Sequence, residues 1–500
     1  MTTPTNAVAI EKNVTSFLGQ PRKMLINGQW EDAATGKDFP AYNPATGEIL
    51  GHAAQGEAED IDRAVNAART ALESGPWKRT SPAERERLMN KLADLIEANA
   101  DEFGQLDTLN NGMPLAAARG GAPYAASMLR YFAGWANKLE GSTIATSLPN
   151  TDEEKYFAFT VREPVGVVGQ IIPWNAPLPL AASKLGPPLA AGCTAVLKPA
   201  EQTPFSALRL GELIEEAGFP PGVVNIVPGY GETAGAALAA HPGVDKISFT
   251  GSTETGKLIA RAATGNLKRV ALELGGKSPN IIFKDADLEA AIPGAATAIF
   301  ANSGQLCTAG SRLYVEKSVF DKVVEGIAEQ AKKIKVGPGM EPGSELGPLI
   351  SDQQYQRVLS YLESGQSDGA QAITGGQHLP DKGYFVEPTL LINAREEMKV
   401  MREEIFGPVV CIVPFEDANE IVATANNTPY GLAAAVWTRD VGKAHRLAAA
   451  MQAGIVFVNC FHVYDVAVPF GGYKQSGWGR EFGRAGVEEY TEVKSVYMKL

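Results

Sequence analysis

The chain has 500 residues, 45% of them hydrophobic and 20% charged, which is typical of soluble globular proteins and too long for a single hydrophobic core. Its net charge of −12 argues against nucleic acid as the main partner, because phosphate binding requires clustered Lys and Arg. No run approaches the ~18 apolar residues of a membrane span, and residues 1–20 lack the basic and apolar regions of a secretory signal.

Cysteine and histidine usage argues against a metal site. The four cysteines form no CxxC pair, and the five histidines include no HExxH motif. A reducing cytoplasm is the expected setting, because a lone reactive thiol survives there. We therefore expect no bound metal and a cytoplasmic protein.

The N-terminal region contains one clear helix start. Residues 1–20 are polar without a periodic pattern, which predicts a loose arm. Ser81, Pro82 and Glu84 then match a capping box with proline at the first helical position. A helical stripe of apolar residues follows it: Leu88, Leu92, Leu95 and Ile96.

From residue 165 onward the pattern alternates between short apolar strands and amphipathic helices, which predicts a doubly wound parallel sheet. The expected strands are 165–172, 194–197, 223–227, 246–250 and 269–274, and the expected helices are 178–191, 206–217 and one that opens near Gly256. Ligands of such sheets lie at the carboxyl ends of the strands. Five polar or small residues stand near such ends: Asn175, Lys198, Glu201, Gly251 and Glu273.

A second α/β series is expected over residues 274–470. Its predicted helices lie near 288–302, 320–333, 353–364 and 441–451. Residues 155–162 and 490–497 read as β arms that reach outside both cores. Because an exposed apolar strand pairs with other edges, we expect these arms to be buried in an oligomer.

Residues 251–258 nearly match a phosphate-binding P-loop. Leu258 replaces the Ser or Thr that binds magnesium, and Glu254 would repel a triphosphate. A glycine-bounded turn into a helix remains, bounded by Gly251 and Gly256, whose helix N-terminus could contact the pyrophosphate of a dinucleotide. A plain tight turn is the alternative, and the chain has no GxGxxG fingerprint.

Two ionisable residues at a strand exit could bind a ribose. Lys198 and Glu201 lie three apart, and an acidic residue binds ribose hydroxyls in dinucleotide folds. If Glu201 contacts the adenosine ribose, its charge favours NAD over NADP. A solvated loop pair is the alternative.

One thiol and one carboxylate suggest covalent catalysis on a carbonyl. Cys307 stands in a polar loop of small residues, and Glu273 precedes a glycine pair. A thiol that attacks carbon needs a base to complete turnover. Cys307 could instead be a buried small hydrophobe, and Glu273 could cap a helix or pair with Lys277. Asn175 could be only a turn residue.

These segments together resemble the aldehyde dehydrogenase superfamily over nearly the whole chain. The matching segments are residues 42–47, 173–175, 198–201, 249–252, 272–277, 304–307, 404–408 and 469–472. The resemblance implies an α/β fold with a Rossmann-type parallel-sheet cofactor domain (residues 1–141 and 163–273) and an α/β catalytic domain (274–475). It also implies a β-arm oligomerisation element (142–162 and 476–500).

The resemblance also implies catalytic roles in an NAD-dependent, hydrolytic enzyme. Cys307 matches the nucleophile that forms a thiohemiacetal and then a thioester. The side-chain amide of Asn175 and the backbone N–H of Cys307 match the oxyanion hole. Glu273 matches the general base of deacylation, and Lys184 and Glu481 match positions of proton relay or support.

NAD is the implied cofactor. Lys198 and Glu201 match its adenosine-ribose ligands, and Glu404 matches its nicotinamide-ribose ligand. The full set of expected cofactor-binding residues is Ile171, Trp174, Lys198, Glu201, Gly251, Ser252, Gly256, Glu404 and Phe406.

Departures from the family pattern concern the substrate. Ala176, Ser183 and Ala301 are small where relatives often carry aromatics, whereas Tyr464 and Phe470 remain as aromatic walls. These residues suggest a wide, flat pocket for an aromatic aldehyde or an arylacetaldehyde such as phenylacetaldehyde. The alternatives are a broad aliphatic or amino-aldehyde enzyme, a CoA-acylating enzyme and a non-catalytic binding protein. A homo-oligomer, dimer or tetramer, is expected.

Overall fold

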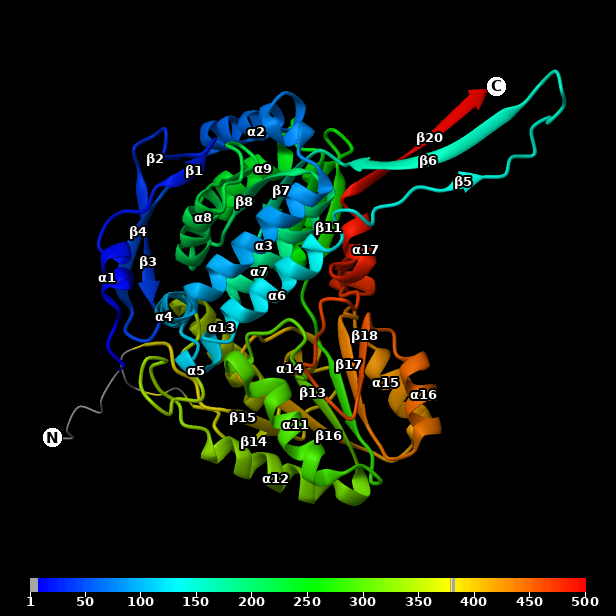
Figure 1. Ribbon diagram of the computed structural model, residues 1–500. Coiled ribbons are helices and arrows are strands. Elements are labelled where there is room, and N and C mark those ends of the chain that lie inside the picture. Colours follow the sequence, from blue (N-terminus) through cyan, green and yellow to red (C-terminus); the bar gives the residue numbers. More distant parts are fainter. Residues whose placement is uncertain (1–7, 378, 380–382) are drawn as a thin grey trace.

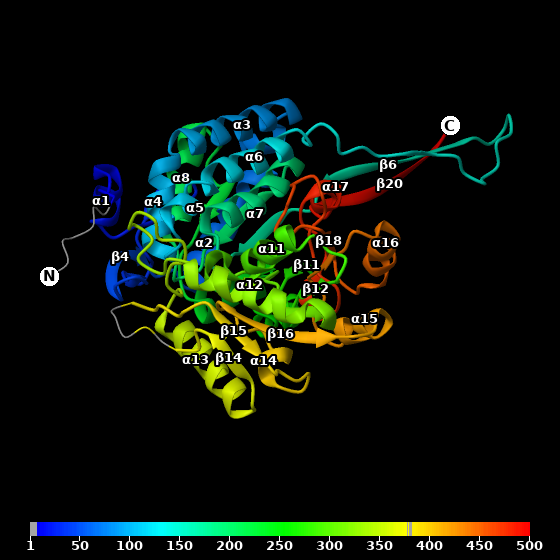
Figure 2. The same cartoon turned by 90° about the horizontal axis from the view of Figure 1, so that it is seen from below.

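The computed structural model describes residues 8–377, 379 and 383–500. Two large sheets with helices around them form the body, and a three-stranded sheet extends away from it (Figure 1, Figure 2). The α/β class expected from the sequence is confirmed. No helix in this described part is long and apolar enough to cross a membrane.

The first sheet has the strand order β19-β11-β10-β7-β8-β9-β1-β2. Its five central strands pair in parallel, as predicted, and antiparallel strands extend it at both edges. The central strands β7, β8 and β10 are buried along nearly their whole length, as expected for parallel strands that are covered on both faces. The strands are β1 (Met24–Ile26), β2 (Gln29–Glu31), β7 (Val167–Ile171), β8 (Thr194–Lys198), β9 (Val224–Ile226), β10 (Lys246–Thr250), β11 (Arg269–Glu273) and β19 (Gly477–Trp478).

Helices cover both faces of the first sheet. Helix α2 packs on one face, and α7 and α8 on the other, with α3, α4 and α6 stacked against them (Figure 1). The helices of this part are α1 (Lys12–Leu18), α2 (Ala58–Glu73), α3 (Pro82–Ala98), α4 (Ala100–Asn111), α5 (Leu115–Ala118), α6 (Gly121–Ala133), α7 (Pro177–Ala191), α8 (Phe205–Ala217), α9 (Ala236–Ala240), α10 (Thr253–Ala263) and α17 (Gly483–Glu488). At the start of α3, the Ser81 side chain accepts the Glu84 N–H, which confirms the predicted cap.

One prediction for this part was wrong. Residues 1–7 of the expected loose arm lie outside the described residues, but α1 forms within the rest of it. Val14 and Phe17, three apart on one helical face, are buried in the core, and Phe17 meets Phe205 edge-on at 6.4 Å.

The connection between β9 and β10, for which the sequence analysis made no prediction, contains a π-helical turn (Gly231–Gly235) and α9. Crossovers between parallel strands usually carry such a helix.

The second sheet has the order β14-β15-β16-β13-β12-β17-β18 and is parallel except for the β14–β15 pair. Its strands are β12 (Pro279–Ile282), β13 (Arg312–Glu316), β14 (Gln371–Thr374), β15 (Thr389–Ile392), β16 (Val409–Phe415), β17 (Ala433–Trp437) and β18 (Ile455–Val458). Its helices are α11 (Leu288–Phe300), α12 (Phe320–Lys333), α13 (Asp352–Ser367), α14 (Lys399–Arg402), α15 (Ala418–Asn426) and α16 (Val441–Ala450). The four helices predicted here are therefore confirmed, to within a few residues at their ends.

Both predicted β arms exist and they pair with each other. Strand β6 (Tyr156–Pro164) and strand β20 (Thr491–Lys499) run antiparallel over their full lengths, and β5 (Thr143–Ile144) adds to β6. They project from the body (Figure 1). A separate hairpin of β3 (Asp38–Asn43) and β4 (Glu48–Ala54) lies near the N-terminus.

Helix α7 carries two prolines in its interior, Pro187 and Pro188, and a side chain of the adjacent sheet replaces one of the backbone hydrogen bonds that they remove. Proline has no N–H, so the carbonyl of Lys184, four residues before Pro188, lacks its helical partner. The buried Gln170 side chain on β7 donates its amide to that carbonyl. This bond fixes the helix backbone at Lys184.

Candidate active site

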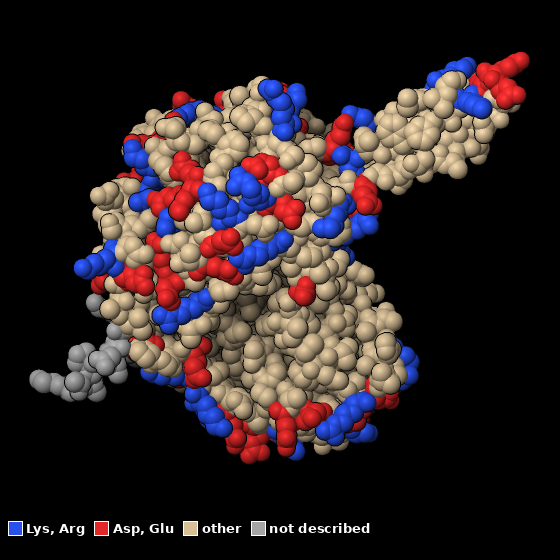
Figure 3. All heavy atoms as spheres, viewed as in Figure 1, with Lys and Arg blue, Asp and Glu red and all other residues tan. Residues whose placement is uncertain are grey.

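A cavity of about 440 Å³ opens where the first sheet's parallel strands end and the second domain begins. Such volumes are usual for small-molecule sites. Figure 3 shows a hollow between the two lobes, surrounded mainly by uncharged side chains. The predicted site residues that line the cavity are Trp174, Asn175, Ala176, Ser183, Gly251, Ser252, Glu273, Cys307, Glu404, Phe406, Tyr464, Phe470 and Glu481.

The loop before Cys307 has an unusual backbone. Asn302, Ser303 and Gly304 all have positive φ, at 49°, 56° and 70°. A side chain on Gly304 would collide with the Gly407 carbonyl, so the loop passes directly against the backbone at Gly407. This close approach turns Cys307 towards the cavity, where it is partly exposed. The alternative of a buried structural thiol is therefore not found.

Asn175 is bonded to the Cys307 loop through both its side chain and its backbone, and its amide keeps one N–H free. Its Nδ2 donates to the Gln305 carbonyl at 2.9 Å, and its backbone carbonyl accepts from Asn302 Nδ2 at 2.8 Å. An amide nitrogen carries two N–H donors, so one remains for a ligand in the cavity. Because both partners precede Cys307 in the same loop, the amide and the thiol are fixed together.

Glu273 is a buried carboxyl at the end of β11. Burial raises its pKa well above the usual range, and the neighbouring Glu481 carboxylate raises it further. Its Oε2 has no hydrogen-bond partner, whereas Oε1 lies close to Gly471, where a side chain would crowd it. A carboxyl with one free oxygen and a raised pKa is suited to proton transfer.

The buried ion pair of Lys184 and Glu481 lies near Glu273. The Lys184 ammonium contacts Glu481 Oε1 and donates to Ser248 Oγ at 2.9 Å. Lys184 does not line the cavity, whereas Glu481 does. Lys184 therefore acts on the cavity through Glu481, and its positive charge opposes the rise in the pKa of Glu273.

The environment of Cys307 does not favour a resting thiolate. Burial raises the pKa of this thiol, and the Glu404 and Glu273 carboxylates raise it further. The sequence suggested a loop whose donors could stabilise a thiolate. The backbone amides of Cys307 and Thr308 do lower the pKa of the thiol, but burial and the two carboxylates raise it by more. Cys307 therefore rests as a thiol and needs a base when it attacks.

The glycine pair after Glu273 makes room for two of these groups. A side chain on Gly275 would meet the Glu404 carboxylate, and one on Gly276 would meet the Cys307 carbonyl. Gly276 N–H also donates to Glu404 Oε1 at 2.9 Å. Burial raises the pKa of Glu404 to about 7. From the C-terminal region, Ser476 Oγ donates to the Gly275 carbonyl at 2.7 Å and so holds this turn.

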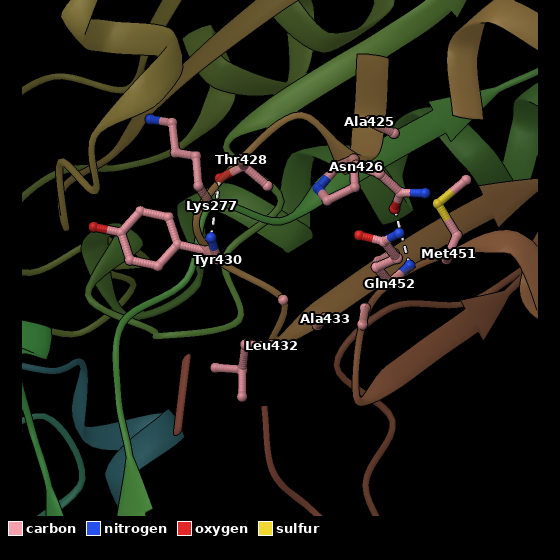
Figure 4. Close-up of a pocket in the computed structure, with 13 residues that line it drawn as sticks. Lys277, Ala425, Asn426, Thr428, Tyr430, Leu432, Ala433, Met451 and Gln452 are labelled. Atoms are coloured by element: carbon pink, nitrogen blue, oxygen red, sulfur yellow. Dashed lines mark hydrogen bonds between the residues drawn. The ribbon is translucent and has the colours of Figure 1, made fainter. Parts of the chain in front are cut away.

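Lys277 does not pair with Glu273, so the alternative in which Glu273 only forms an ion pair with Lys277 is not found. Its Nζ is fully buried without a hydrogen-bond partner, and burial lowers its pKa to about 8. In Figure 4 its side chain extends away from Asn426 and Gln452, which bond to each other at 2.9 Å. This small pocket of about 10 Å³ is separate from the main cavity.

The expected cofactor residues fall into two groups. Trp174 and Phe406 line the cavity with their rings perpendicular at 5.3 Å. Lys198 and Glu201 pair at 3.2 Å, outside the cavity lining, and Lys198 is buried, so the solvated-pair alternative is not found. Ile171 is buried at the end of β7, and Gly256 lets α10 pack closely on Leu274.

The candidate substrate residues that line the cavity are two aromatics and two small residues. The rings of Tyr464 and Phe470 lie 6.0 Å apart, and Ala176 and Ser183 line the same cavity. The Tyr464 hydroxyl is 2.6 Å from Thr308 Oγ1, next to Cys307. The sequence analysis missed further lining residues: Tyr124, Met128, Leu180 and Phe482. Tyr124 and Met128 are four apart on α6, a spacing that could have shown their common face.

Comparison with known proteins decides the family. The family model for the aldehyde dehydrogenase family matches residues 30–496. This chain belongs to the aldehyde dehydrogenase family. Retinal dehydrogenase 2 of Homo sapiens is 50% identical over 481 residues, which cover 96% of this chain and 92% of the relative. The family resemblance inferred from the sequence is therefore confirmed.

Solved structures support the same conclusion. An aldehyde dehydrogenase from Bacillus cereus in complex with NAD⁺ matches with a TM-score of 0.96 and 48% identity, over 99% of this chain and 100% of that one. An indole-3-acetaldehyde dehydrogenase of P. syringae, also solved with NAD⁺, matches with a TM-score of 0.93 and 44% identity over 96% of each chain. The predicted fold, the NAD cofactor and the NAD-dependent aldehyde dehydrogenase activity are confirmed at this level.

The residues at the strand ends of this aldehyde dehydrogenase fit NAD. Thr250 lines the cavity at the end of β10, and its buried hydroxyl has no partner, so a polar ligand could satisfy it. Ser252 caps α10 through a 3.2 Å bond from Thr255 N–H, and this leaves the helix's first amides directed outward for an anion. No group of three or more His, Cys, Asp or Glu side chains that could hold a metal ion occurs in the part of the chain described.

The Asn175 amide leads to a testable prediction. Asn175→Ala removes a donor that faces the cavity beside the thiol, so we expect kcat to fall by about 10²–10³-fold, or roughly 3–4 kcal/mol, with KM little changed. Steady-state NADH formation measures both constants. Asn427→Ala, which removes an exposed amide outside the cavity, is the control. A loss confined to KM would contradict a role for the Asn175 amide in stabilising the transition state.

Proposed function

We propose that this enzyme oxidises an aldehyde to a carboxylic acid through a covalent intermediate on Cys307. The proposal rests on one observation: a thiol, an amide with a spare donor and a buried carboxyl with a free oxygen line one cavity. These are the groups that addition to a carbonyl and hydrolysis of a thioester require.

The first step is attack of Cys307 Sγ on the aldehyde carbon. The C–S bond forms as the thiol proton passes to a nearby carboxylate, for which Glu404 and Glu273 are the candidates. The carbonyl oxygen becomes negative, and the Asn175 amide and the Cys307 N–H stabilise it. The product is a thiohemiacetal.

Oxidation and release complete the reaction. When bound, NAD supplies the acceptor for the hydride that leaves the tetrahedral carbon, so that Cys307 then carries a thioester. Glu273 takes a proton from water, the resulting hydroxide attacks the thioester carbon, and the C–S bond breaks. The acid leaves and the thiol is restored. The Lys184–Glu481 pair supports Glu273 and offers its proton a route outward.

We also propose how this chain holds NAD. Lys198 and Glu201 would bind the adenosine ribose, and the negative charge of Glu201 would disfavour a 2′-phosphate and thus NADP. Gly251, Ser252 and Gly256 would shape the turn at the pyrophosphate. Trp174, Phe406 and Ile171 would pack beside the cofactor, and Glu404 would bind the nicotinamide ribose.

An arylacetaldehyde is the proposed substrate class. Tyr464 and Phe470 line the cavity with aromatic rings, and Ala176 and Ser183 line it with small side chains that leave room for a ring. The similarity to an indole-3-acetaldehyde dehydrogenase supports an aromatic substrate. The similarity to retinal dehydrogenase 2 keeps a long aliphatic aldehyde as the competing candidate.

A substrate panel tests this proposal. We expect kcat/KM for phenylacetaldehyde to exceed that for acetaldehyde by at least about tenfold, because ring burial adds apolar area and stacking. Retinal is included as the competing long aldehyde. Each aldehyde is assayed with NAD, with NADP and with added CoA. Higher kcat/KM for an aliphatic aldehyde would reject the substrate class, and strict CoA dependence would reject hydrolytic release.

Assembly and location are proposed on separate grounds. The paired arm of β6 and β20 projects from the body with exposed Val493, Tyr497 and Met498, so we propose that it is covered in a homodimer or homotetramer.

We also propose domain boundaries at residues 141/142, 162/163, 273/274 and 475/476. A reducing cytoplasm would keep the Cys307 thiol free for catalysis.

A further inference from the structure

Helix α4 presents an unusual polar face to the interior of the protein. Asp107, Asn110 and Asn111 lie at positions i, i+3 and i+4 and therefore share one side of the helix. All three are at most 2% exposed. Buried polar groups of this kind need specific partners, and each of these has one in the segment that follows β7 or β8.

The two asparagines reach the exits of two adjacent parallel strands. Asn111 Nδ2 donates to the Trp174 carbonyl at 2.9 Å, in the turn after β7. Asn110 Nδ2 donates to the Gln202 carbonyl at 2.7 Å, in the turn after β8. Only the nitrogen of an amide can pair with a carbonyl, so these contacts fix both side-chain orientations.

Asp107 holds the helices that leave these turns. Its carboxylate accepts from Ser206 Oγ at the start of α8 and from the Leu178 N–H in the first turn of α7. The residue before α7, Ala176, has no side chain that could cap the helix. Asp107 therefore supplies the missing cap from α4.

We infer that Asn111 is a positioning residue for the Asn175 amide, and that Asn110 is a positioning residue for the Lys198–Glu201 pair. Trp174 directly precedes Asn175, and Gln202 directly follows Glu201, so each bond fixes the backbone beside one functional group. One helix thus sets the spacing between the oxyanion donor and the ribose-binding turn. The inference rests on the proposed function of those two groups.

Paired substitutions separate the two roles. Asn111→Ala should slow hydrolysis of 4-nitrophenyl acetate, which needs Cys307 and Asn175 but no cofactor, by about tenfold, and raise the NAD Kd by a clearly smaller factor, because Trp174 also packs beside the proposed cofactor. Asn110→Ala should raise the NAD Kd by about tenfold and leave ester hydrolysis within about twofold. Calorimetric titration gives Kd, and melting temperature monitors folding.

A purely structural helix face gives a different result. If both variants change the ester rate and the NAD Kd in equal proportion, or change neither, the inference is overturned. Should an alanine variant fail to fold, Asn111→Leu and Asn110→Leu replace it, since they fill the volume without a donor. The proposed function fails separately, when the wild-type enzyme forms no NADH from any aldehyde of the panel.

Discussion

Replacing Cys307 with alanine abolishes aldehyde oxidation, by at least about 10⁴-fold in kcat/KM, while NAD binding is retained. The loss is this large because Cys307 is the only thiol among the described residues that line the cavity, and a hydroxyl is a much weaker nucleophile at neutral pH. Steady-state NADH formation measures activity, and calorimetry measures NAD affinity. Mass spectrometry should find an acyl adduct on the wild-type chain in a rapid quench and none on the variant.

Cys460→Ala provides the matched control for this experiment. Cys460 is also a free, partly exposed cysteine, but it does not line the cavity. Its loss should leave kcat/KM within about twofold, as for most substitutions away from a functional site. Oxidation that persists in Cys307→Ala at the wild-type rate would exclude the covalent route.

Replacing Glu273 with glutamine stalls the enzyme after one turnover. Glutamine keeps the shape of the side chain but cannot accept a proton from water, so we expect the steady-state rate to fall by about 10²–10⁴-fold. The thiol proton can still pass to Glu404, so a burst of NADH close to one equivalent per active site should precede the slow phase. Stopped-flow absorbance resolves the two phases, and mass spectrometry detects the thioester. A burst slowed as much as the steady state would assign Glu273 to the thiol instead.

The same carboxyl predicts the direction of the pH dependence. Only ionised Glu273 can act as a base, and burial with the Glu481 charge raises its pKa. Steady-state activity should therefore fall as pH decreases through this raised pKa, above the usual range of glutamate. The acid limb should be absent in Glu273→Gln. Its persistence in that variant would assign it to another group, for which Glu404, with a pKa of about 7, is the first candidate.

Local apolar patterns explain what could be predicted from the sequence. Strand β10 and helix α12 have the expected bounds because β10 alternates polar and apolar residues up to the Gly251 turn and an amphipathic helix has a clear period. Helix α4 could not be predicted in this way, since Asp107, Asn110 and Asn111 look like surface residues until their partners are known. Short α1 was hidden by polar neighbours of Val14 and Phe17.

The candidate site also has features that could be predicted from the sequence and features that could not. The identities of Cys307, Glu273 and Asn175 followed from their motifs and the family resemblance. The rise in the pKa of Cys307 did not, because it arises from burial in the folded protein and from Glu404, which is 97 residues away in the sequence and adjacent only in the fold. Tyr124 and Met128 were missed for the same reason, since α6 meets the cavity only after α7 has packed on it.

The order in which the cavity is completed has a consequence during synthesis. Cys307 leaves the ribosome long before Ser476, which holds the Gly275 turn, and Glu481, which pairs with Lys184. A nascent chain that ends before these residues contains the Cys307 thiol but lacks the contacts that hold the Gly275 turn and pair with Lys184. Domains fold as they emerge, so both sheets can form before Glu481 is available to complete the active site. A prematurely released chain would thus hold an exposed nucleophile but could not turn over aldehyde.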